Sequence, residues 1–138
     1  MDHLVYVDEK AKELHGLLGG RTTMIVRGAA RPKPPFGHVQ SEDRLFFVLG
    51  DGLITACSVV NHVHHAEHLT ESQSRNLLKT NQFKLNLAPE QIEHWAGKRY
   101  LVLIEVKNVH LIEPFHISGT AYGSIDAWLH VEKIESVQ

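Results

Sequence analysis

The sequence has 138 residues, of which 43% are hydrophobic and 22% charged, and its formal net charge is −2 at pH 7. This composition excludes a disordered chain and a protein that binds nucleic acid through an overall basic surface. No apolar run reaches the length of a membrane span, and the N-terminus "MDHLVYVDEK" lacks the features of a secretory signal. Together with the single Cys57, which cannot form an internal disulfide, this predicts one domain over residues 1–138 that is cytoplasmic and has no membrane partner.

The N-terminal half predicts strands that surround one helix and one long loop. Strands are expected over residues 3–7, 22–28, 44–49 and 53–63, where β-branched and aromatic residues dominate. Asp8 is expected to cap a helix over residues 9–18, and Gly19 ends it. Three prolines over residues 28–43 predict a long loop, and Gly50 to Gly52 predict a tight turn.

The C-terminal half predicts two helices followed by two strands. Thr70 and Gln73 form a capping box for a helix over residues 71–81, and Pro89 suits the first turn of a second helix. Strands are expected over residues 99–112 and 126–134. Strands outnumber helices and short connections dominate, which favours an α+β fold: a small, mainly antiparallel β-barrel with helices covering its ends.

Several stretches resemble motifs of the PUA-like superfamily and, within it, of the ASCH domain. "GRTTMIVR" is similar to the family pattern that leads from a helix into a strand, with Thr22 at a lysine place and Arg27 at an arginine place. "PFGHVQSEDRLFFV", the "LT-E" of residues 69–71 and "KRYLVLIEVKNV" follow in the family order. The resemblance implies the same small barrel and a cleft that binds RNA or a modified nucleotide.

One ASCH branch is an amidohydrolase acting on N4-acetylcytidine, and it uses a lysine, a threonine and a glutamate. The matching positions here hold Thr22, Ile25 and, near the glutamate place, Leu77. These side chains cannot act as an amine base or transfer a proton. The sequence therefore favours a binding module without assigned catalytic residues or cofactors. The alternative is an enzyme of the same fold, either a nucleoside amidohydrolase or a ribonuclease.

A local basic segment indicates where an anionic ligand would bind. Between Arg21 and Gln40 there are four basic residues and no acidic one. Arg27 and Lys33 are predicted to hold a phosphate or a base edge, since arginine provides a bidentate donor. The alternative for Arg27 is a structural ion pair with Glu105 or Asp43.

Three aromatic residues complete the predicted ligand site. Phe36 in the Pro-rich loop, Tyr122 and Trp128 are expected to stack on a base, as aromatic side chains do in single-strand recognition. The alternative for Phe36 is packing on the barrel. The alternative for Trp128 is closure of the core, with its indole N–H bonded to a carbonyl.

The segment "NHVHHAEHLT" over residues 61–70 holds four of the eleven histidines. At the end of a strand, His62 and His64 share one face, and His68 lies in the following turn. A zinc site needs three or four converging ligands, and no established zinc motif is present. We therefore predict no metal site here. A metal-dependent protein using His62, His64 and His68 is the third interpretation, and the sequence leaves the oligomeric state open.

Overall fold

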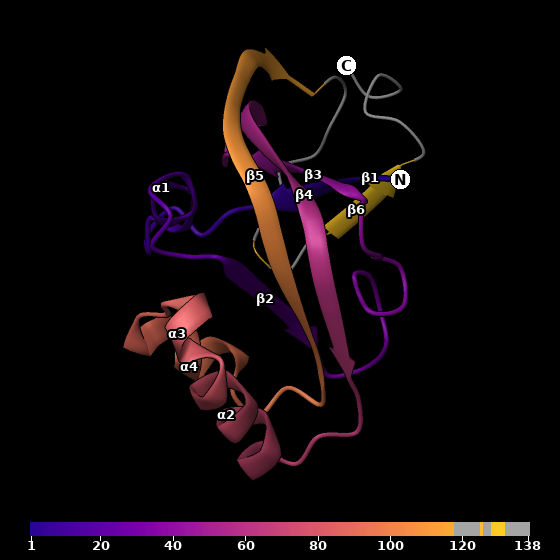
Figure 1. Cartoon of the computed structure of the whole chain (residues 1–138). Helices are drawn as coiled ribbons and strands as arrows, with labels where there is room; N and C mark the ends of the chain where they lie inside the picture. Colours follow the sequence, from indigo (N-terminus) through magenta and orange to yellow (C-terminus); the bar gives the residue numbers. More distant parts are fainter. Residues whose placement is uncertain (118–124, 126–127, 132–138) are drawn as a thin grey trace.

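The structure is a computed structural model that describes residues 1–117, 125 and 128–131. Six strands and four helices make up the described part (Figure 1). In chain order they are β1 (Asp2–Tyr6), α1 (Glu13–Leu18), β2 (Met24–Ala29), β3 (Arg44–Val48), β4 (Leu53–Ala66), α2 (Glu71–Thr80), α3 (Gln82–Leu85), α4 (Pro89–Trp95), β5 (Tyr100–His116) and β6 (Trp128–Val131).

The strands form one curved sheet, a half-barrel, in the order β2-β5-β4-β3-β1-β6. The β1–β3 pairing is parallel and the other four are antiparallel, so the expected α+β, mainly antiparallel barrel is confirmed. The long strands β4 and β5 form its centre, pairing from Leu53 with His116 down to Ala66 with Leu101. The short strands β2 and β6 lie at its two edges.

Strand alternation divides the apolar residues among three clusters: one in the interior of the half-barrel, one under α2 to α4, and one that includes Leu4, Phe46 and Ile54 of β1, β3 and β4. On β2, Ile25 faces the interior of the half-barrel, whereas Met24 and Val26 face outward and pack with α2 to α4. On β5, Val102 lies in the interior and Leu101 under the helices. The helices α2 to α4 lie together at the lower end of the sheet (Figure 1), where they bury the apolar outer face of β2 and β5.

The first helix is shorter than expected. It begins at Glu13 rather than at residue 9, and its N-cap is Lys12, which has the left-handed conformation with φ of 56°. Asp8 instead stabilises the preceding turn, where its Oδ1 accepts the Ala11 N–H at 3.1 Å. The consequence is a compact turn over residues 8–12 that directs the Glu13 side chain inward.

Other sequence-based predictions are confirmed at the level of single residues. The Thr70 side chain accepts the Gln73 N–H, and Gln73 Oε1 accepts the Thr70 N–H, which is the expected capping box of α2. No helix or strand interrupts the Pro-rich loop between Ala29 and Arg44. In the part of the chain that the structure describes, no helix is long and apolar enough to cross a membrane.

Candidate functional site

Arg27 projects from β2 into the protein and its side chain is only 3% exposed. Nη2 and Nη1 donate to the two carboxylate oxygens of Glu13, at 2.7 and 3.1 Å, and Nη2 also donates to the Tyr6 carbonyl oxygen at 3.0 Å. The guanidinium therefore joins β2, α1 and the end of β1. This arginine takes part in a buried ion pair, although with neither of the partners expected from the sequence.

The two carboxylates that the sequence offered as partners of Arg27 are engaged elsewhere. Glu105 accepts hydrogen bonds from Lys84 and Asn61, and the Lys84 contact contributes most to lowering the pKa of Glu105. Asp43 is bound to His3. Glu13 was not predicted as the partner of Arg27, because the sequence of its helix indicated only an apolar face. Its position one turn before the buried Leu17, on the same face of the helix, is the signal that could have identified it.

The Pro-rich loop places Phe36 against the sheet. Its ring meets the rings of His65 and Tyr100 edge to face, with centroids 5.6 and 5.2 Å apart, and it is half-buried against the interior core. His65 also fixes the loop, because its Nδ1 accepts the Gly37 N–H at 3.2 Å and its Nε2 lies 3.3 Å from the Val39 carbonyl oxygen. Lys33 is exposed on the same loop. Contact of either residue with a ligand stays a prediction.

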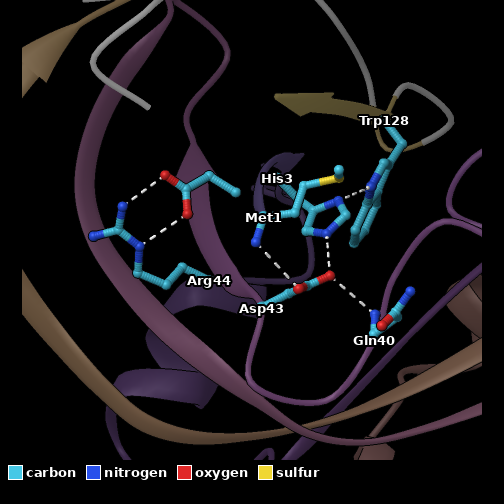
Figure 2. A network of polar contacts seen from close by, with 7 residues as sticks. Met1, His3, Gln40, Asp43, Arg44 and Trp128 are labelled. Carbon is cyan, nitrogen blue, oxygen red and sulfur yellow. Dashed lines mark hydrogen bonds and ion pairs between the residues drawn. The ribbon is translucent and has the colours of Figure 1, made fainter. Parts of the chain in front are cut away.

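Trp128 belongs to a buried network at the other edge of the sheet (Figure 2). Its indole N–H donates to Nδ1 of the fully buried His3 at 3.0 Å, rather than to a carbonyl. Since Nδ1 accepts, the neutral imidazole carries its proton on Nε2 and donates to Asp43 at 2.8 Å. Trp128 thus closes the core in this structure, while Tyr122 lies outside the described residues.

The histidine-rich segment continues β4 and then turns into α2. His62 and His64 are exposed on the strand, and His68 has the left-handed conformation with φ of 53°. Its Nδ1 lies 3.4 Å from the Tyr100 hydroxyl. Among the described residues, no three His, Cys, Asp or Glu side chains are grouped as metal ligands would be.

We expect this histidine segment not to bind zinc with high affinity, because two exposed imidazoles on one strand lack the further ligands of a closed site. Elemental analysis of the untagged protein should find well below one zinc per chain. One zinc per chain that disappears in the His62→Ala, His64→Ala double variant would contradict this prediction.

Three neighbouring cavities surround the start of α1, with volumes of about 220, 600 and 320 Å³. We call them together the α1 cleft, because each is lined by residues of the segment 7–16. The smallest lies between α1, the entry to β2, and the helices α3 and α4. The lining of this smallest cavity includes Lys12, Glu13, His15, Gly16, Arg21, Thr22, Asn86 and Gln91.

Two wall residues of the α1 cleft have hydrogen-bonding groups that the described protein atoms leave unused. The Thr22 hydroxyl has no hydrogen bond within the described residues, and a Cβ atom on Gly16 would lie only 2.7 Å from its Oγ1. Gly16 therefore leaves room for this hydroxyl. Gln91 uses its Oε1 to accept the Ala88 N–H, which leaves its NH₂ group for a ligand.

The comparisons with known proteins concern the fold. The fold is that of the ASCH domain. The ASCH protein of Zymomonas mobilis superposes with a TM-score of 0.70 over 98% of this chain and 90% of that chain, at 8% identity. A serine-to-alanine variant of it gives 0.69 over 98% and 91%, at 10% identity, and a tyrosine-to-phenylalanine variant gives 0.68 over 98% and 93%, at 9% identity. No family model and no curated protein matches the sequence.

The three positions matched to the amidohydrolase residues lie in different environments. Thr22 lines the α1 cleft, Ile25 is buried in the interior core, and Leu77 lines a separate cavity beside α2. No two of them line one cavity among those described here.

Proposed function

We propose that this protein is an RNA- or nucleotide-binding module whose ligand enters the α1 cleft. The observation that carries the proposal is the charge of the smallest cavity. Glu13 is the one carboxylate among the described residues of its lining and is neutralised by Arg27, which leaves Lys12 and Arg21 as the uncompensated charges there. A cationic rim around unused hydrogen-bonding groups suits a phosphate with a base or sugar attached.

Arg27 supports the same proposal in a second way. Its Nε–H is buried and has no hydrogen-bond partner in the part of the chain that the structure describes. A buried donor without a partner costs free energy, so such groups are uncommon unless water or a ligand satisfies them. Arg27 does not line the cavities itself, but it lies directly behind the lining residue Glu13, which holds its two terminal nitrogens. In this proposal the acceptor that Nε lacks is a ligand atom or a water molecule that enters beside Glu13.

Lys33 and Phe36 of the Pro-rich loop extend the proposed contact surface beyond the cleft, and a contact of Tyr122 with the ligand stays a prediction. Trp128 is not part of this surface, because it is buried against His3.

The test compares Arg21→Ala with Lys79→Ala, which removes an exposed lysine from α2 outside the cleft. Arg21→Ala should weaken binding of a short single-stranded RNA about tenfold or more, because a charge-assisted contact is worth about 1.5–3 kcal/mol. Lys79→Ala should change affinity less than about threefold. Fluorescence anisotropy at low salt measures both, and Lys33→Ala in the same assay tests the loop.

Equal affinities for Arg21→Ala, Lys33→Ala and the parent protein would contradict the assignment of the site. Absence of binding to any RNA or nucleotide at low salt, where the electrostatic contribution is strongest, would contradict the proposed function itself. The same samples should show intact RNA on a denaturing gel. Shortened RNA, lost with His15→Ala, would instead support the ribonuclease alternative, because His15 and Lys12 line the same cavity.

A further inference from the structure

A further cavity of about 470 Å³ is lined by the end of β4, the segment that follows it and α2. Figure 1 shows these elements at the lower end of the sheet. This cavity shares no lining residue with the α1 cleft. One wall comes from the histidine-rich segment, with His64 and His68. The other comes from Gln73, Asn76 and Thr80, which lie at helical spacing on one face of α2.

The polar groups of this α2 cavity are largely unused. Within the described part of the chain, the side chains of His64, Asn76 and Thr80 make no hydrogen bond. Gln73 uses only its Oε1, in the capping box, so its NH₂ group remains. Asn76 offers both a donor and an acceptor from one planar group, which is how carboxamides recognise the edge of a base.

The backbone holds His68 at the rim of the cavity. Its left-handed conformation is uncommon for a residue other than glycine and costs free energy. Neighbouring contacts maintain it: the Leu69 N–H donates to the Arg99 carbonyl at 3.0 Å, and the Tyr100 ring meets the imidazole with centroids 5.4 Å apart. The imidazole plane is therefore positioned before any ligand binds.

The charge of the lining decides which class of ligand fits. The described residues of the lining include no lysine or arginine, and the one carboxylate among them, Glu67, has a side chain that is 60% exposed. An isolated phosphate would find no permanent positive charge there. A transition metal would lack a third ligand among the described residues. A neutral planar ligand can use the carboxamides and contact Leu69 and Leu77.

We propose that the α2 cavity is a binding site for a nucleobase. Asn76 recognises the hydrogen-bonding edge of the base, and His64, His68 and Leu77 contact its ring. The site does not depend on the α1 cleft. It gives a role to the histidine-rich segment, for which neither the fold nor the proposed function provides one.

The experiment follows the histidine imidazole resonances of the full chain by NMR while uridine, cytidine, adenosine or guanosine is added. At least one nucleoside should shift the His64 and His68 resonances in a saturable way, whereas ribose should not. Asn76→Ala should weaken this binding about tenfold, as expected for loss of hydrogen bonds to the base. Ser72→Ala, an exposed change on α2 outside the cavity, is the matched control and should have no effect.

Arg21→Ala should leave nucleoside binding at the α2 cavity unchanged, so failure of the α1 cleft proposal is distinguishable from failure of this one. No saturable shift of His64 or His68 with any of the four nucleosides would overturn the inference. So would equal shifts with ribose alone, shifts confined to His15 in the α1 cleft, or unchanged affinity in a folded Asn76→Ala variant.

Discussion

Replacing Glu13 with glutamine should lower the free energy of unfolding by about 3–5 kcal/mol, because it leaves the Arg27 guanidinium buried without a counter-charge. Both side chains of this pair are less than a tenth exposed, so solvent cannot replace the lost carboxylate. Urea denaturation at neutral pH measures the effect. The double variant Glu13→Leu, Arg27→Leu should be more stable than Arg27→Leu alone, because removing both charges avoids leaving one unpaired.

The matched control is Glu42→Gln, which breaks an ion pair with Lys107 at the surface. The side chains of Glu42 and Lys107 are 70% and 38% exposed, so solvent screens their interaction. The loss in free energy of unfolding should therefore stay below about 1 kcal/mol. If Glu13→Gln cost no more than Glu42→Gln, the buried pair would not be a stability determinant. The comparison also guides binding experiments, since an Arg27 variant is expected to lose stability.

Asp43→Asn should destabilise the protein by about 1.5–3 kcal/mol at neutral pH. The Asp43 carboxylate accepts from His3 and the Gln40 N–H through Oδ2, and from the N-terminal ammonium group through Oδ1. An asparagine has only one oxygen, so its NH₂ group must face one of these donors.

The pH dependence of stability should also change in this variant. Burial raises the pKa of Asp43, but the hydrogen bonds from His3, Gln40 and the N-terminus together outweigh it, so the pKa lies below 3.8. A lowered pKa in the folded state adds stability at pH values above the ordinary carboxyl pKa, and this stability is lost as the pH falls through the folded value. Unfolding measured between pH 7 and pH 2 should show this loss.

In Asp43→Asn, the acid-induced loss of stability should be smaller than in the parent protein. Asp51→Asn serves as control, because Asp51 lies in an exposed turn where it accepts from the Leu53 N–H and has only a long, exposed contact of 4.0 Å with His116 among the described residues. Identical acid profiles for the parent protein and Asp43→Asn would show that the network in Figure 2 does not depend on the carboxylate charge.

Much of the fold could be predicted from the sequence because local chemistry determines it. The capping side chains of Thr70 and Gln73 lie three positions apart, so a pattern of four residues is sufficient to predict where α2 begins. Residues 24–26 of β2 and 100–104 of β5 have apolar side chains on both faces of the sheet. A continuous run of apolar residues in the sequence is typical of such a strand. The short α3 and the late start of α1 were not predicted, since their boundaries depend on tertiary contacts rather than on a strong local signal.

The candidate site was harder to predict because its partners are distant in sequence. Arg27 was identified as important, but its partner Glu13 lies 14 positions earlier on another element, and no local pattern connects the two. Trp128 was correctly considered as a core residue, but its acceptor His3 is 125 positions away. Thr22 was considered only as a substituted catalytic position, and its place in a cavity wall became evident from the packing of α1 and α4.

The order of the strands has a consequence for how this chain folds during synthesis. β1 leaves the ribosome first, yet its antiparallel partner β6 is made more than a hundred residues later, as the His3–Trp128 contact shows. Until then one edge of β1 presents unpaired backbone groups, which is a state prone to pairing with other chains. The slow step of folding should therefore be the arrival of β6, because contacts between such distant residues require closure of a long loop.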